Sequence, residues 1–256
     1  MLSYLQSLAI VLVSVALVLG LTTLWNRRLE EQLRERSNLV NGSQLMILGT
    51  IYAVLLGFML SDAWITYQRS NDDVRSEAAA ALTIYRSSSL LPAACAQSMK
   101  NAAADYVRTA ITVEWPSMER HKADFQGSSI VAKMWTIVDR CSENGNWSET
   151  ARENIISSME TLQACREARM EDYGGRLPPL LWSVLLFGAV VVVAASSLLG
   201  NESKQIHMLH VVSLTVIISV SLLAISDLDR PFDGATRVDS TAFRAVEANI
   251  SQQSGT

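Results

Sequence analysis

The sequence predicts an all-α integral membrane protein with four transmembrane helices and one helical domain outside the bilayer. Of its 256 residues, 49% are hydrophobic and only 18% are charged, which is on the membrane side of the balance in soluble proteins. The charges are also segregated, because four long stretches carry almost none and one internal segment carries most. These observations place the four stretches in hydrocarbon and the charged segment in water.

Four charge-poor stretches predict the spans. Residues 1–26, 37–61 and 177–201 contain no Asp, Glu, Lys or Arg, and residues 205–226 contain no ionisable group except two histidines. Each stretch can hold the roughly 20 apolar residues that cross ~30 Å of hydrocarbon as a helix. The first stretch lacks the basic n-region and the small-residue cleavage site of a signal peptide, so we expect a retained helix.

The segment boundaries follow from these stretches. The prediction is a first span at 1–26, a short charged loop at 27–43, a second span at 44–68, a helical extramembrane domain at 69–176, a third span at 177–200, a short loop at 201–207, a fourth span at 208–226 and a polar tail at 227–256. Asn41-Gly42 supplies the expected turn before the second span.

The segment between the second and third spans reads as helical. It holds 13 of the 21 basic and 15 of the 25 acidic residues, and it is rich in helix formers such as Ala, Glu, Arg and Met. Pro92 suits the first turn of a helix that Trp115-Pro116 should end. Thr150 and Glu153 form a capping box for a later helix. That helix carries an apolar stripe, Ile155, Met159 and Leu162.

The cysteines and the loop charges bear on the compartment. Cys95, Cys141 and Cys165 match no zinc pattern, and an odd number favours free buried thiols in a reducing compartment. One disulfide with one free thiol is the alternative. With four spans, both chain ends and the long domain would lie on one side of the membrane and the two short loops on the other. The short loops hold five Lys or Arg, and the side with the chain ends holds three, or eight when the flanks of the long domain are included. The positive-inside rule therefore does not decide the orientation.

One face of the second span is a candidate pore lining. In a symmetric oligomer such a face could ring a pore and gate it by dewetting. Ordinary helix packing, in which Gly49 and Gly57 admit neighbouring helices, is the alternative. The face consists of residues at three- and four-residue spacing, namely Ile51, Val54, Phe58, Ser61, Asp62 and Ile65.

Asp62 is the only ionised residue that we place inside a span. A carboxylate near hydrocarbon is costly, so it usually faces a water-filled cavity or a charged partner. Asp62 lies roughly one and a half turns from the predicted end of its span, so snorkelling to the membrane surface is an alternative. The candidate partners are Arg69, Arg176 and Arg230. Without such a partner, a carboxylate in a pore would favour cations.

No motif for catalysis, metal or cofactor binding is recognisable. The sequence has no G-x-S-x-G, P-loop or H-E-x-x-H pattern, and its three histidines have no evident nucleophile or metal partner. The acidic residues from 227 to 239 lack calcium-loop spacing. No basic stripe suggests nucleic acid. We therefore expect no enzyme activity and no cofactor.

Several strings, taken in order, carry a family resemblance. They are residues 49–58 (GTIYAVLLGF) with Trp64, Glu77-Ala78, residues 113–116 (VEWP), residues 180–182 (LLW) and residues 228–234 (LDRPFDG). In this order they resemble the bacterial bestrophin-like membrane family over about residues 9–243. We assign structural roles to the motif residues Glu114, Trp115, Pro116, Asp229, Arg230, Pro231 and Phe232.

True bestrophins are pentameric, anion-selective channels with cytosolic termini, and their pore narrows at a neck on the second span. The resemblance implies a homo-oligomeric, pentameric passive channel for inorganic anions such as chloride. It also implies a multi-pass protein of the bacterial inner membrane, embedded in the lipid bilayer, with a cytosolic extramembrane domain. The chain departs from the animal channels in lacking their neck proline and a dense acidic clasp after Gly234. The alternative is a non-conducting scaffold or sensor whose helical domain binds a partner.

Overall fold

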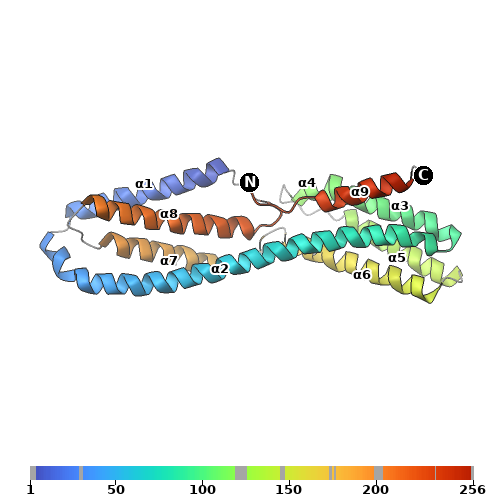
Figure 1. The fold of residues 1–256 in the computed structure, drawn as a ribbon, viewed down its shortest axis with the longest axis horizontal. Helices are drawn as coiled ribbons and strands as arrows, with labels where there is room; N and C mark the ends of the chain where they lie inside the picture. Colours follow the sequence, from blue (N-terminus) through green and yellow to red (C-terminus); the bar gives the residue numbers. More distant parts are fainter. Residues whose placement is uncertain are drawn as a thin grey trace. The chain divides into compact units, whose positions relative to one another are not determined.

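Every element in the described part of the chain is a helix. The computed structural model describes residues 4–28, 31–118, 126–144, 148–172, 175, 177–198, 204–233 and 235–254. In chain order the elements are α1 (Tyr4–Arg28), α2 (Glu31–Ser87), η1 (Ser88–Leu90), α3 (Ala93–Thr109), η2 (Ala110–Glu114), α4 (Trp115–Met118), α5 (Gln126–Asn144), α6 (Glu149–Asp172), α7 (Pro179–Leu198), α8 (Lys204–Leu228) and α9 (Thr241–Ser254) (Figure 1).

The chain divides into two compact units. The part of α2 up to Thr66 belongs to unit 1, and the part from Tyr67 belongs to unit 2. Unit 1 comprises Met1–Thr66 and Arg176–Asp229, and unit 2 comprises Tyr67–Gly175 and Arg230–Thr256. We describe each unit by itself.

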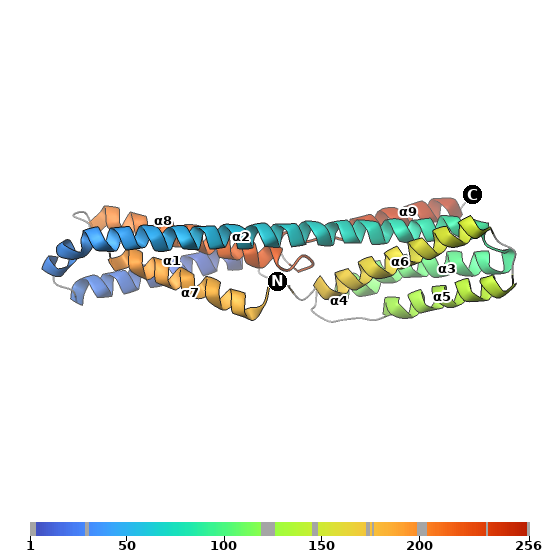
Figure 2. The same ribbon diagram turned by 90° about the horizontal axis from the view of Figure 1, so that it is seen from below.

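Unit 1 is a bundle of α1, α7, α8 and the first part of α2, in which α8 contacts both α1 and α7 (Figures 1 and 2). Among the described residues, every exposed large hydrophobic side chain except Leu90 belongs to this unit. By length and composition, α2 from Gly42 onward, α7 and α8 could each cross a membrane, whereas the apolar stretch of α1, Leu8–Gly20, is shorter. An apolar outer surface of this extent is characteristic of contact with lipid or other protein.

The packing of α2 on α7 depends on one close approach. Tyr52 is buried, and its hydroxyl donates a 2.9 Å hydrogen bond to the carbonyl oxygen of Leu185. The Tyr52 ring lies against Gly188, where a Cβ atom would come within 2.6 Å of two ring carbons. Val192 and Ile218 complete this buried cluster. A small residue at position 188 is therefore needed for the two helices to meet.

Unit 2 encloses an apolar core between α3, α5, α6, α9 and the second part of α2 (Figure 2). The stripe predicted for α6 is buried completely, because Ile155, Met159 and Leu162 are each 0% exposed. The predicted polar tail at 227–256 includes α9, which presents Phe243, Val246 and Ile250 to the same core.

The helix that begins with α3 continues past Trp115 and Pro116, so the predicted end at these residues is wrong. The chain passes through the π-helical turn η2 into α4, which ends at Met118. In the wide turn, the Trp115 N–H donates to the carbonyl oxygen of Ala110, five residues earlier. Proline lacks an N–H and clashes with the preceding turn of a regular α-helix, and a wider turn before Pro116 relieves that conflict.

Two predicted boundaries also differ. Asn41-Gly42 makes no turn, because α2 runs unbroken from Glu31 to Ser87, and a helical glycine costs only about 1 kcal/mol. The residue that caps α6 is Ser148 and not Thr150, since the Ser148 hydroxyl accepts the Ala151 N–H at 3.1 Å. Residues 201–203 of the predicted short loop and Gly234 lie outside the described residues.

Cys95 and Cys141 form a disulfide bond, and Cys165 is free. The favoured prediction of three free thiols is therefore wrong, and its alternative is correct. The two bonded cysteines are 46 residues apart in sequence, and the packing of α3 on α5 brings them together. Spacing along the chain carries no signal of that packing.

We predict that Gly188→Ala lowers the stability of unit 1, because its methyl group would overlap the Tyr52 ring. Overpacking of this kind typically costs about 1–3 kcal/mol. The control is Gly20→Ala, since no heavy atom lies within 4 Å of the Cβ position at Gly20. Thermal unfolding of the purified protein in detergent measures both variants, and equal midpoints would contradict the close approach.

Candidate functional site

All six predicted pore-lining residues are exposed on one side of α2. We call this side the open α2 face, and it consists of Ile51, Val54, Phe58, Ser61, Asp62 and Ile65. Phe58 is its most exposed hydrophobic residue, at 70%. The side of the helix that faces away from these residues carries Tyr52 and Ala63, which are buried within the protomer. The open α2 face is therefore left to be covered by water, lipid or another copy of the chain.

Packing within the protomer does not account for the open α2 face. Gly49 and Gly57, expected to admit neighbouring helices, have no heavy atom within 4 Å of their Cβ positions. The close helix contact in this unit is made at Gly188 instead. The packing alternative therefore requires contact with another molecule.

Asp62 is exposed on this face. Among described residues 42–66, 179–198 and 205–226 it is the only Asp, Glu, Lys or Arg. It has no ion pair or side-chain hydrogen bond with the described residues of unit 1. Of its candidate partners, Arg69 and Arg230 belong to unit 2, and Arg176 lies outside the described residues.

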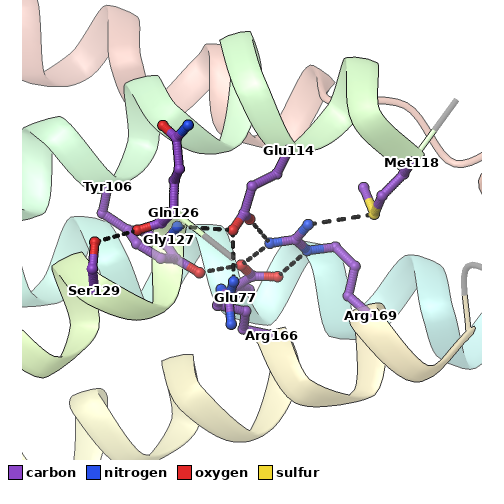
Figure 3. A network of polar contacts seen from close by, with 9 residues as sticks. All are labelled: Glu77, Tyr106, Glu114, Met118, Gln126, Gly127, Ser129, Arg166 and Arg169. Carbon is purple, nitrogen blue, oxygen red and sulfur yellow. Dashed lines mark hydrogen bonds and ion pairs between the residues drawn. The ribbon is translucent and has the colours of Figure 1, made fainter. Parts of the chain in front are cut away.

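A second concentration of polar side chains lies buried in unit 2 (Figure 3). We call it the ion cluster, and it consists of Glu77, Glu114, Arg166 and Arg169. Arg169 donates to Glu77 from Nε to Oε2 at 2.7 Å and from Nη2 to Oε1 at 2.8 Å. The same Nη2 lies 2.7 Å from Oε2 of Glu114, whose Oε1 accepts from Arg166 Nη2 at 2.7 Å. The cluster thus pairs two carboxylates with two guanidinium groups, and its net charge is zero.

Neighbouring groups complete the coordination of the ion cluster. The Tyr106 hydroxyl donates to Glu77 Oε1, and the Arg169 guanidinium carbon lies 4.9 Å from the centre of the Trp115 ring, within cation–π range. The backbone N–H of Gly127 donates to Glu114 Oε1 at 3.2 Å. A Cβ atom at position 127 would lie 2.2 Å from that oxygen. Only glycine therefore allows the start of α5 to approach Glu114 so closely.

Burial and the neighbouring charges shift the pKa values of Tyr106 and Arg169. Burial, followed by the charge of Glu77, raises the pKa of Tyr106 well above its ordinary value. Burial lowers the pKa of Arg169, but the carboxylates of Glu77 and Glu114 outweigh this effect, and the net pKa is raised. The phenol therefore stays a neutral donor and the guanidinium stays charged. The arrangement can hold α2, η2 and α6 together.

The predicted motif residues take different places. Trp115 is buried and meets Phe232 edge to face, with ring centres 6.2 Å apart. Asp229 accepts the Leu177 N–H at 2.9 Å, and the Pro231 carbonyl oxygen accepts the Val238 N–H at 2.7 Å. Glu114 belongs to the ion cluster. Pro116, two residues later, is half-buried, and Arg230 is exposed. Most of the motif residues thus make contacts inside the protein.

The sequence analysis missed four residues of this site, Arg166, Arg169, Tyr106 and Gly127. A signal for the two arginines was present, because they extend the apolar stripe of α6 at the same four- and three-residue spacing, 155, 159, 162, 166 and 169. Charged residues on the buried face of an amphipathic helix need buried partners. The sequence carries no comparable signal for Gly127.

Unit 1 also contains a cavity of about 620 Å³ between α1, α7 and α8. Its walls are aliphatic, apart from serine and threonine hydroxyls such as those of Ser14, Thr22 and Thr215. The Thr22 hydroxyl is engaged with the Val18 carbonyl oxygen and with Ser197. No acid, base or charged group lines the cavity, so it offers space for apolar matter and no machinery for proton transfer.

We predict that Arg169→Met lowers the free energy of unfolding by about 3–5 kcal/mol, because Glu77 and Glu114 would keep buried charges without their shared partner. Arg108→Met is the control. The Arg108 side chain is 66% exposed, and its one ion pair with a described residue is with Asp105, at 3.5 Å, so its loss should cost no more than about 1 kcal/mol. Denaturant unfolding followed by circular dichroism compares the variants, and similar losses for both would rule out the cluster as the stabilising contact.

Comparison with known proteins gives the family. The family model described as the Bestrophin-like domain matches residues 12–243, and no curated protein matches the chain. Among solved structures, two variants of a bacterial bestrophin homologue from Klebsiella pneumoniae are similar to this chain. One has a TM-score of 0.75 at 14% identity, covering 98% of this chain and 99% of that one, and the other has 0.73 at 12% identity, covering 96% and 99%. The structural likeness establishes the fold, and the match of the family model over most of the length shows that the chain belongs to the Bestrophin-like family.

Proposed function

We propose that this protein is an oligomeric passive ion channel whose pore is lined by the open α2 face. The observation that carries the proposal is Asp62, an exposed carboxylate within a helix apolar enough to span a membrane. A carboxylate costs about 2.5–3.5 kcal/mol at the centre of a span on insertion scales, and less toward the end of a span, where Asp62 lies. A face that bears it is therefore better placed against water than against lipid, and a ring of copies supplies a water-filled axis.

The proposed topology has four spans in each protomer. To α2, α7 and α8 it adds α1, which is 25 residues long and so has the length to cross the hydrocarbon. The helical domain then lies between the second and third spans, with the boundaries predicted from the sequence. Both chain ends and this domain share one side of the membrane.

Membership of the Bestrophin-like family supports the channel function. From the resemblance to true bestrophins we carry over a pentameric assembly in a bacterial inner membrane and a preference for anions such as chloride. One feature of the chain opposes the anion preference, because a ring of Asp62 carboxylates would attract cations and repel anions. Asp62 is therefore the residue at which selectivity is best tested.

The scaffold alternative draws no support from the surface of unit 2. A large contiguous apolar patch on a surface marks a site of protein or membrane interaction. Among the described residues of unit 2, Leu90 is the only large hydrophobic side chain that is exposed. The apolar surface available for association lies in unit 1.

Recording from the purified protein in planar bilayers tests the proposal. We predict that Phe58→Ala raises the open probability, because a bulky apolar ring at the narrowest point disfavours wetting. Phe187→Ala in α7 is the matched control, since it removes the same side chain at nearly the same exposure, 71% against 70%. It should leave the open probability unchanged.

Two results would count against the channel. Folded wild-type protein that carries no current in any salt would favour the scaffold. A protein that stays monomeric by native mass spectrometry in detergent would exclude a pore around a central axis. If both phenylalanine variants change the current alike, the open α2 face has no special place in conduction.

We further predict that Asp62→Asn shifts the reversal potential toward the equilibrium potential of the anion, because it deletes one negative charge per subunit from the pore wall. The measurement is the reversal potential in a salt gradient across the bilayer. Asp105→Asn is the control, since the Asp105 side chain is also exposed, at 53%, but lies in α3 of unit 2. An unchanged reversal potential for Asp62→Asn, with conduction intact, would remove Asp62 from the permeation path.

A further inference from the structure

The cavity of unit 1 opens at the outer surface of the unit between α1 and α7. Helix α8 packs against both of these helices, which make little contact with each other. The cavity fills the space between them, and Thr215 and Ile218 of α8, which are 3% and 5% exposed, form its floor. The large lining residues that are themselves exposed are Val13, Leu17, Leu186 and Val190. The rim is therefore aliphatic and continuous with the apolar outer surface of the unit.

The cavity is too narrow for a helix of another copy of the chain. Its lining residues on α1 run from Val13 to Thr22, a rise of about 14 Å along the helix. With a volume of about 620 Å³, the mean cross-section is then roughly 45 Å². An α-helix with its side chains is about 10–12 Å across and so takes roughly 80–110 Å². A hydrocarbon chain fits, because its carbon atoms pack at about 4 Å from their neighbours.

Water finds few hydrogen-bonding partners in this cavity. Three of the five hydroxyl groups among the described lining residues donate to the carbonyl oxygen four residues earlier in their own helix. They are those of Thr22 at 2.7 Å, Ser197 at 2.9 Å and Thr215 at 2.7 Å. An ordered water needs about two to four polar partners, and apolar cavities stay dry. An empty space would in turn deprive its walls of dispersion contacts, so the walls favour an apolar occupant.

We propose that this cavity binds an acyl chain of a membrane phospholipid, which enters sideways between α1 and α7. Helices α7 and α8 are each long and apolar enough to cross a bilayer, so acyl chains surround the rim when the protein is in its membrane. The bound chain supplies the packing between α1 and α7 that the protein itself does not provide. Such binding requires neither ion conduction nor a fourth span.

Photolabelling tests the proposal with the full chain reconstituted in phosphatidylcholine vesicles. A fraction of the phosphatidylcholine carries a diazirine on one acyl chain, and mass spectrometry identifies the labelled residues after irradiation. Phe187 of α7 is 71% exposed and does not line the cavity, so label there reports lipid at the outer surface. Ile218 is buried and lines the cavity, so label there reports an acyl chain inside it. Wild-type protein should carry label at both residues.

Two variants fill the cavity from different helices. Ser219→Phe adds a ring from α8 and Ala194→Phe adds one from α7, since both residues line the cavity. Each variant should lose the label at Ile218 and keep the label at Phe187. The matched control is Ala16→Phe, because Ala16 of α1 is exposed, as Ala194 is, but does not line the cavity. It should keep both labels.

Three results would overturn the proposal. Label at Phe187 without label at Ile218 in wild-type protein would mean that the cavity is empty or covered by another copy. Label at Ile218 that persists in a filled variant, shown to be folded by its thermal unfolding transition, would mean that the label does not come from the cavity. Loss of that label in Ala16→Phe as well would mean the same. If neither filled variant folds, the wild-type measurement decides alone.

Discussion

Glu77, Glu114, Arg166 and Arg169 are buried together in unit 2, and their mutual pairing constrains how α2, η2 and α6 can meet. Removing an ion from water costs several kcal/mol even after relaxation, and only well-placed partners offset that cost. Arg169 pairs with Glu77 of α2 and with Glu114 of η2, so rotation or sliding of α6 would leave at least one carboxylate without its partner. An apolar core tolerates such shifts far better. We infer that the ion cluster contributes more to the choice of a single arrangement than to net stability.

The local irregularities of unit 2 make sense as consequences of this pairing. The π-helical turn η2 ends at Glu114 and so sets the rotation at which this carboxylate enters the core. Gly127 lacks the side chain that would collide with the same carboxylate. The Trp115 ring covers the guanidinium of Arg169 and in turn meets Phe243 at 5.4 Å. The strings that carry the family resemblance, around residues 77, 114 and 232, thus meet in space although they are far apart in sequence.

The sequence predicted what depends on local pattern and missed what depends on tertiary contact. Charge-poor stretches and the stripe at Ile155, Met159 and Leu162 predicted helices and their buried faces, since both follow from helical periodicity. Proline rules failed at Pro116, because the turn before it, η2, is widened and so relieves the clash that a proline makes in a regular α-helix. Free cysteines were favoured because pairing across 46 residues has no sequence signal. The six residues of the open α2 face are all exposed, but their role as a pore lining stays a prediction, because it depends on what surrounds the protomer.

The geometry of α2 suggests how copies could assemble around the open α2 face. Successive residues are rotated by about 100° round a helix, so Gly57 lies on a flank of the face that Phe58 centres. In a ring, one side of each α2 would meet the axis and its flanks would meet neighbouring copies. The flank at Gly57 is unfilled within the protomer, and small residues are where membrane helices approach closely. Asp62 and Gly57 are thus both compatible with a ring of copies. The carboxylate would face water along one side of α2, and the glycine leaves room for a neighbouring helix beside it.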